Sequence, residues 1–304
     1  MPVSSAQPRV VVVGDVINDI LVKPAGPVVR GSDTVSEIKA SPGGSAASQA
    51  AWMAHLGLDV TFAARCGARD ASFHRSSLSA YGVRPVLFAD PDAETGSIVI
   101  MVSPDGERTM FTDRGANLRL RASDVPVSLL DGAAVLHLTG YTFFTPGLRS
   151  VALGLMAGAR ARGVTVTVDP GSAAFLAELP AGEFLAWTAG AALCFPNLDE
   201  AAALVPRGDP ASLAASLAKH YGAVVLKLGG GGCLIARAGS EPVVVPASRL
   251  GSDLVDTTGA GDAFCAAFLS QWLSGSGELD DAARFAVQVA AEAVGRLGGR
   301  PPRP

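Results

Sequence analysis

Hydrophobic and polar residues alternate along this chain with two different periods, and each period predicts a different element. Short runs rich in β-branched residues occur at 10–13, 60–64, 135–138, 164–168, 193–195 and 224–228. Alanine- and leucine-rich stretches of helical length separate them, at 45–56, 71–81, 148–162, 200–205, 213–221, 260–273 and 280–296. Strands that alternate with helices in this way are typical of βα units around a parallel sheet. We therefore predict a three-layer α/β/α core with a mostly parallel central sheet.

Two segments, about 20–40 and 84–113, interrupt this pattern with apolar–polar alternation and turn residues between the runs. Strands are expected at 35–38, 85–88, 97–102 and 109–112, with a hairpin turn at 104–106. Strands inserted between βα units indicate a small β-sheet that stands off the core as a lid over a site, although an ordinary sheet extension would give the same pattern. Residues 1–296 are interpreted as a single domain and 297–304 as a flexible C-terminal tail.

Composition narrows the class of protein. Of the 304 residues, 49% are hydrophobic and 17% are charged, and the formal net charge is −4. A large core is therefore available, and without blocks of like charge neither nucleic acid nor an anionic membrane surface is the expected partner. The apolar runs are far shorter than the roughly 20 residues of a membrane span, and the first residues do not resemble a signal peptide, so a cytoplasmic location is expected. Buried, reduced thiols are expected from the spacing of Cys66, Cys194, Cys233 and Cys265.

The strongest chemical signal is the segment Asp-Thr-Thr-Gly-Ala-Gly-Asp at 256–262, directly before a predicted helix. A Gly-Ala-Gly turn that begins a helix directs free backbone N–H groups and the positive end of the helix dipole to one point, which forms an anion hole. Asp262 then lies in the first helical turn, where its carboxylate could accept a proton from a hydroxyl that attacks a phosphoryl group. In isolation, a plain tight turn with an acidic residue at a helix start has the same pattern.

Two other segments place small or polar residues beside predicted elements. Residues 41–50 carry a Gly pair that leads into a helix rich in small residues, a pattern that in isolation more often serves close packing. Residues 14–19 follow the first strand, at the sheet edge where open α/β sheets bind ligands. Neither a G-x-G-x-x-G fingerprint after that strand nor a P-loop motif is present, which excludes the two common nucleotide-binding motifs.

Together these motifs resemble the ribokinase-like (PfkB) family of carbohydrate kinases along essentially the whole chain. The resemblance rests on the Gly pair at 43–44, the N-x-x-E motif at 197–200, the glycine-rich loop at 228–232 and the segment at 256–262, in that order. It implies ATP-dependent phosphorylation of a primary hydroxyl of a small sugar or sugar acid. Asp262 would be the general base, and the transferred phosphoryl group would be held by Gly259, Ala260 and Gly261.

The same resemblance implies ATP and Mg²⁺ as cofactors, with a monovalent cation such as K⁺ as a further candidate near Asp256 and Thr258. Asn197 and Glu200 correspond to the family's magnesium and phosphate network, and Glu200 would act on the metal through water. The loop expected to lie along ATP contains Lys227, Gly229 and Gly232.

For the sugar, the resemblance implies Asp19, Gly43 and Gly44 as binding residues. Ser48 stands where the family carries an Asn, and Thr139 stands near the position of a sugar-binding Glu in ribokinases, so these residues leave the particular sugar open. Other polar residues expected to face the cleft are Asp15, Asn18, Arg114 and Asn117. Arg114 could pair with a carboxylate or phosphate of the substrate, or simply with Asp113 or solvent.

Three alternatives stay open. A nucleoside kinase of the same family would need a base pocket, for which the aromatic candidates are Phe111, Tyr141, Phe143 and Phe144. A non-catalytic sugar-binding protein is motivated only by Ser48, and an oxidoreductase would need the absent dinucleotide fingerprint. The expected partners are therefore a small-molecule sugar and ATP, together with a second copy of the chain through the lid.

Overall fold

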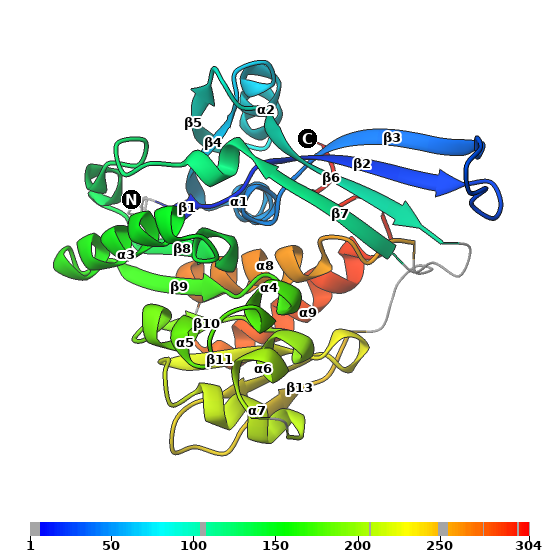
Figure 1. Ribbon diagram of the computed structural model, residues 1–304. Helices are drawn as coiled ribbons and strands as arrows, with labels where there is room; N and C mark the ends of the chain where they lie inside the picture. Colours follow the sequence, from blue (N-terminus) through cyan, green and yellow to red (C-terminus); the bar gives the residue numbers. More distant parts are fainter. Residues whose placement is uncertain are drawn as a thin grey trace, which may run out of the picture.

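The computed structural model describes residues 7–103, 108–206, 208–248, 255–275, 277–296 and 298–303. Within them, nine strands form the main sheet in the order β13-β12-β11-β10-β9-β8-β1-β4-β5 (Figure 1). The strands from β11 to β5 run parallel to one another, and β12 and β13 add an antiparallel edge. Their bounds are β1 Arg9–Val13, β4 Asp59–Gly67, β5 Arg84–Asp90, β8 Val135–Thr139, β9 Thr165–Asp169, β10 Leu193–Cys194, β11 Ala223–Lys227, β12 Cys233–Ala236 and β13 Val243–Val245.

Helices cover both faces of this sheet, because consecutive side chains of a strand point to opposite faces. Val10 and Val12 of β1 join one hydrophobic core, and Val11 and Val13 join the other. The first core packs against α1 Ser45–His55, α2 Ala71–Ser79, α8 Ala260–Ser274 and α9 Leu279–Ala293. The second packs against α3 Pro146–Ala161, α4 Ala173–Ala177, α5 Glu183–Thr188, α6 Leu198–Leu204 and α7 Pro210–Leu217. The predicted three-layer core is confirmed.

The lid is a separate sheet of four strands in the order β3-β2-β6-β7, which projects from the main body in Figure 1. β2 pairs antiparallel with β3 and parallel with β6, and β6 pairs antiparallel with β7. The strands are β2 Ile17–Pro24, β3 Ser36–Gly43, β6 Thr95–Val102 and β7 Arg108–Gly115. The small mixed sheet expected from the sequence is therefore present, while the expected hairpin turn at 104–106 lies outside the described residues.

One strand assigned to the lid from its sequence belongs elsewhere. The segment 84–113 was expected to contribute lid strands along its whole length, but β5 at its start is the edge of the main sheet, parallel to β4. Helix α2 lies between these two strands, so β4-α2-β5 is an ordinary crossover unit of a parallel sheet. The apolar run at 85–88 predicted a strand correctly, but a run this short does not specify its partner.

The end of the chain packs against the main body, contrary to the flexible tail expected for 297–304. The N–H of Gly298 donates to Asp256 Oδ2 over 2.9 Å, and the indole N–H of Trp52 donates to the carbonyl of Gly299 over 3.0 Å. Arg300 donates to Ser77 Oγ over 2.9 Å. The described residues 298–303 therefore connect α1, α2 and the segment before α8, and Figure 1 places the C-terminus at the base of the lid.

Two expectations from composition can be compared with this fold. All four cysteines are buried and free, as their spacing predicted. Within the described ranges, every helix is too short or too polar to cross a membrane.

Candidate active site

Two cavities meet at the turn that begins helix α8. The larger cavity has a volume of about 580 Å³ and the smaller cavity about 480 Å³. Ala260 and Gly261 line the larger cavity, whereas Thr258 and Asp262 line the smaller one. Neighbouring residues of a single turn therefore form the wall between the two cavities, so that a molecule in each could meet across this turn.

The larger cavity combines an apolar wall with a polar end. Phe264 of α8 and Val287, Ala290 and Val294 near α9 form its apolar part, which suits a flat heterocycle. Its polar end is formed by residues that include Asn197, Lys227, Gly229, Gly230 and Gly232. Gly229 and Gly230 belong to the 3₁₀ turn that follows β11, so backbone groups approach the cavity without side chains in between.

Lys227 is a fixed positive charge on the wall of the larger cavity. It ends β11, and its ammonium group donates to Asp169 Oδ2 over 3.0 Å. Burial alone would lower the pKa of Lys227, but the charges of Asp169 and Glu200 outweigh burial and raise that pKa. The lysine therefore stays protonated and is suited to attract a phosphate group.

Asn197 and Glu200 form a capping box at the start of α6. The Asn197 side chain accepts from the Glu200 N–H over 2.8 Å, and Glu200 Oε2 accepts from the Asn197 N–H over 2.9 Å. The other carboxyl oxygen of Glu200 accepts from Asn197 Nδ2, also over 2.9 Å. Burial raises the pKa of Glu200. Asn197 reaches the larger cavity, and Glu200 lies directly behind it.

The turn before α8 depends on two glycines that lie in contact. Gly259 has a φ of 75°, and a Cβ there would lie 2.3 Å from the Cα of Gly299. Only glycine fits this position, both for its left-handed backbone and for the close approach of the C-terminal segment. Within the described residues, the N–H groups of Gly259 and Gly261 have no backbone acceptor, whereas the Ala260 N–H donates to Thr257 over 3.3 Å. The expected anion hole therefore has free donors at Gly259 and Gly261.

Asp262 lies between the two cavities with one carboxyl oxygen held and the other free. Its Oδ1 accepts from Ser45 Oγ over 2.6 Å and from Gln49 Nε2 over 2.9 Å. No donor among the described residues contacts Oδ2. Burial raises the pKa of Asp262 to about 7, against the opposite effect of the hydrogen bonds from Ser45 and Gln49. This is the acid strength expected of a general base near neutral pH.

The smaller cavity collects several of the acceptor residues expected from the sequence. Asp15, Asp19, Gly44, Ser48 and Arg114 all line it. Asp19 fits here only because Gly43 has no side chain. A Cβ at Gly43 would lie 2.0 Å from Asp19 Oδ2. Burial and the nearby Asp15 raise the pKa of Asp19 to about 6.

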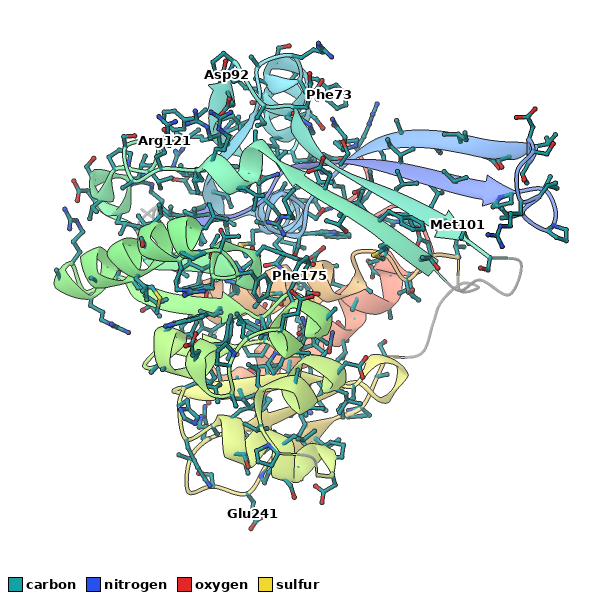
Figure 2. All side chains as sticks on the ribbon, viewed as in Figure 1. Phe73, Asp92, Met101, Arg121, Phe175 and Glu241 are labelled. Atoms are coloured by element: carbon teal, nitrogen blue, oxygen red, sulfur yellow. The ribbon has the colours of Figure 1, made fainter. Side chains whose placement is uncertain are left out.

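Arg114 is the cationic side chain that lines the smaller cavity. Its guanidinium lies 4.4 Å from the ring centre of Tyr141, which itself lines the cavity and donates to the carbonyl of Gly171. No carboxylate among the described residues pairs with Arg114, and Asp113 instead accepts from the N–H of Gly115. Figure 2 shows Phe175 at the centre of the molecule, below the lid strands, where it lines the same cavity.

Some expected site residues lie outside the cavity. Asn18 points to α2, where it donates to Asp70 over 2.8 Å and contacts His74 Nε2 at 2.9 Å. Asn117 is tied to the backbone N–H and carbonyl of Val16 and so joins the two ends of the lid. Thr139 is fully buried at the end of β8 and does not line either cavity. These residues therefore support the lid and the sheet rather than the cavity wall.

Other residues at the site are not among the candidates that the sequence motifs indicate. Gln49 lies beside Ser48 in α1 and contacts Asp262, and Asp169 ends strand β9 and pairs with Lys227. The rule that ligands bind at the carboxyl ends of parallel strands would have indicated Asp169. Gly299 lines the smaller cavity from the C-terminal segment, which no local pattern indicated.

No group of three or more histidine, cysteine, aspartate or glutamate side chains that could hold a metal occurs in the described residues. The carboxyl oxygens of Glu200 each accept one hydrogen bond and can accept another. A single carboxylate with this remaining capacity suits a hard cation that keeps its water ligands and is bound mainly by phosphate oxygens, as Mg²⁺ usually is.

Comparisons with known proteins identify the family to which this chain belongs. An ATP-dependent ribose-1-phosphate kinase of Halopiger xanaduensis is 29% identical over 90% of this chain and 87% of its own. The structure of adenosine kinase from Sinorhizobium meliloti matches with a TM-score of 0.85 and 25% identity, and the match covers 98% of this chain and 97% of the adenosine kinase chain. The structure of Arabidopsis thaliana ribokinase complexed with ribose and ATP matches with a TM-score of 0.79 and 26% identity, and this match covers 98% of this chain and 96% of the ribokinase chain. The model of the pfkB family carbohydrate kinases matches residues 7–304. The chain is therefore a carbohydrate kinase of the pfkB family.

Proposed function

We propose that this enzyme transfers the γ-phosphoryl group of ATP to a primary hydroxyl of a small sugar or sugar acid, with Asp262 as the general base. One observation carries the proposal: a single helical turn places Gly261 on the larger cavity and Asp262 on the smaller one. ATP in the larger cavity and the acceptor in the smaller one would bring their reacting atoms together at this turn.

Each part of the turn has a role in the transfer. Asp262 Oδ2, which has no hydrogen-bond donor among the described residues, accepts the proton of the attacking hydroxyl. The free N–H groups of Gly259 and Gly261, at the positive end of the α8 dipole, stabilise the charge on the transferred phosphoryl group. In-line positioning and charge neutralisation are the main requirements of phosphoryl transfer, so little covalent chemistry is asked of the protein.

The nucleotide and its cation have matching residues around the larger cavity. The heterocycle of ATP suits the apolar wall beside Phe264, and Lys227 and the glycines after β11 suit its phosphates. Mg²⁺ would be held by the phosphates and, through water, by Glu200 and Asn197, and it would neutralise phosphate charge. A nearby cation favours the ionised form of Glu200, which burial disfavours.

Arg114 supports an acceptor that carries an anionic group. Among the described residues its guanidinium has no carboxylate partner, and the same cavity wall presents the acidic side chains Asp15, Asp19, Glu178 and Asp262. An acceptor with hydroxyls at the aspartates and a carboxylate or phosphate at Arg114 would match this distribution of charge. Sugar acids and sugar phosphates both have that form.

A nucleoside kinase is the second candidate. Tyr141 and Phe175 line the smaller cavity and could contact a base. Of the other aromatic residues considered from the sequence, Phe143 is fully buried in the core and Phe111 is exposed on the lid. The aromatic lining is thus smaller than the sequence suggested. A non-catalytic sugar-binding protein is disfavoured by the free Oδ2 of Asp262 and the free N–H groups beside it.

The test is ADP release with Mg-ATP against ribose, fructose, ribose 1-phosphate, a 2-keto sugar acid and adenosine. The proposal expects rapid turnover with a sugar or an anionic sugar, and preference for adenosine would favour the nucleoside kinase. Asp262→Asn should retain ATP binding and lower kcat by about 10² to 10⁴. Wild-type turnover in this variant would contradict the assigned base.

The pH dependence of kcat gives an independent readout. A base must be ionised, and burial holds the pKa of Asp262 at about 7. The value of kcat should therefore rise about tenfold per pH unit below pH 7 and level off above it. An acid limb near pH 4, the usual range of an aspartate, would mean that another group limits the reaction.

Two expectations from the sequence stay predictions. The first is a homodimer through the lid, which exposes apolar side chains such as Val35, Ile38 and Phe111. The second is activation by a monovalent cation near Asp256 and Thr258.

A further inference from the structure

Gln49 lies fully buried in α1, directly behind the general base of the proposed function. Its amide nitrogen is 2.9 Å from Asp262 Oδ1 and 3.2 Å from Asp169 Oδ2. Asp169 in turn accepts from Lys227 on the wall of the larger cavity. A single amide group therefore contacts both the base beside the smaller cavity and the carboxylate that pairs with the lysine of the larger one.

The orientation of this amide is determined by a second buried side chain. Facing two carboxylates, the amide must present its NH₂ group to them, so Gln49 Oε1 points to His137 Nε2 at 2.5 Å. His137 Nε2 must then carry the proton, and His137 Nδ1 accepts from Thr167 Oγ1 over 2.8 Å. Hydrogen bonds thus run in one direction from Thr167 through His137 and Gln49 to the carboxylates.

His137 keeps this direction over a wide pH range. Burial lowers the pKa of His137 to about 4, so the ring is neutral at the pH where the enzyme works. His137 and Thr167 are both fully buried on adjacent strands of the main sheet, where rotation of either group is blocked by packing. The chain of donors is therefore rigid as well as directional.

We propose that Gln49, oriented by His137, is the positioning residue that holds Asp262 for phosphoryl transfer, with Oδ1 engaged and Oδ2 free for the acceptor hydroxyl. Ser45, at the rim, supplies the other hydrogen bond to Oδ1. Two donors on one oxygen prevent the carboxylate from rotating, so the free oxygen keeps one direction. This inference rests on the assignment of Asp262 as the base.

The same hydrogen bond controls the ionisation of Asp262. A donor to the ionised carboxylate favours that form, so Gln49 lowers the pKa of Asp262 against the effect of burial. Loss of this donor should therefore move the acid limb of kcat to higher pH. Other titratable or charged groups around Asp262 in the described residues include Asp169, Lys227, Tyr141, Cys265 and the neutral His137, together with Asp15, Asp19, Arg114 and Glu178 on the wall of the same cavity.

The experiment compares Gln49→Leu, His137→Leu and His137→Gln with the wild type. Kinetics use Mg-ATP with whichever of ribose, ribose 1-phosphate and fructose the wild type phosphorylates. Gln49→Leu should move the acid limb up by about one pH unit and lower the plateau kcat by about 10- to 100-fold, with the KM for ATP unchanged within about twofold. His137→Leu should shift the acid limb and the plateau kcat in the same directions as Gln49→Leu does. His137→Gln, which keeps an N–H donor, should retain the wild-type values of both.

A second readout needs no acceptor. In protein with ¹³C-labelled aspartate carboxyl groups, the signal absent from Asp262→Asn identifies Asp262, and its titration should shift upwards by about one pH unit in Gln49→Leu. Thr167→Val, a mild change, should shift it less but in the same direction. Thr188→Val is the matched control, because Thr188 is also buried and bonded to a ring group, the Tyr221 hydroxyl, away from the site.

The outcomes separate the inference from the proposed function. Wild-type turnover in Asp262→Asn would reject the base itself. Loss of turnover in Asp262→Asn, together with an unchanged titration and an unchanged acid limb in Gln49→Leu and His137→Leu, would reject the positioning role alone. An equal shift in Thr188→Val would also reject the positioning role, because the shift would then follow from the loss of any buried polar group.

Discussion

Removal of the C-terminal segment should damage both stability and the active site. The perturbation is a stop codon that ends the chain at Arg296. It removes the hydrogen bonds of Gly298 to Asp256, of Trp52 to Gly299 and of Arg300 to Ser77. It also removes Gly299 from the wall of the smaller cavity and from contact with Gly259.

The expected loss follows from these contacts. The neutral hydrogen bond of Trp52 contributes about 1 kcal/mol, and the two that involve a charged group, Asp256 or Arg300, contribute about 2 kcal/mol each, which gives about 5 kcal/mol. A protein of this kind has a free energy of unfolding of about 5–15 kcal/mol, so the truncation removes a large part of it. The melting temperature should fall by roughly 10 °C.

The assay is a thermal melt followed by circular dichroism, with acceptor KM measured well below the melting temperature. A chain that ends at Pro302 is the matched control, because it loses only Arg303, which is exposed, and the last residue. The control should behave as the wild type, whereas the truncation at Arg296 should raise the acceptor KM. If the longer truncation melts and turns over as the wild type does, the packing of the tail does not matter, and the flexible tail expected from the sequence is correct.

Other substitutions probe separate parts of the structure. Lys227→Met removes the positive charge from the larger cavity and should raise the KM for ATP about tenfold or more in steady-state assays. Gly259→Ala places a Cβ against Gly299 at a φ of 75°, and the backbone strain alone costs about 1–2 kcal/mol. This variant should lower kcat by a larger factor than it changes the KM for ATP. Arg65→Met breaks a buried pair of bridges to Asp90 and Asp124 and should lower the urea midpoint clearly, while Arg69→Met, at an exposed bridge, should leave it within error.

Local features of this protein follow from the sequence alone. The run of valines in β1 alternates between two cores because side chains of any strand alternate, and its four consecutive apolar residues already indicate burial on both faces. The turn at 256–262 is equally local. Its glycines, the helix start and Asp262 lie within seven residues, so backbone chemistry places the free N–H groups and the carboxylate side by side.

Only the tertiary structure decides which distant segments meet. The short run of β5 predicts a strand, but pairing with β4 rather than with the lid depends on the crossover through α2. The tail carries no periodic pattern, yet Gly299 packs so close to the turn before α8 that a Cβ at Gly259 would lie 2.3 Å from the Gly299 Cα. Gln49, His137 and Asp169 come from α1, β8 and β9, and their hydrogen bonds appear only once the sheet and its helices are packed. Periodicity and turn chemistry act over a few residues, whereas these strand pairings and buried hydrogen bonds join residues from 23 to 120 positions apart.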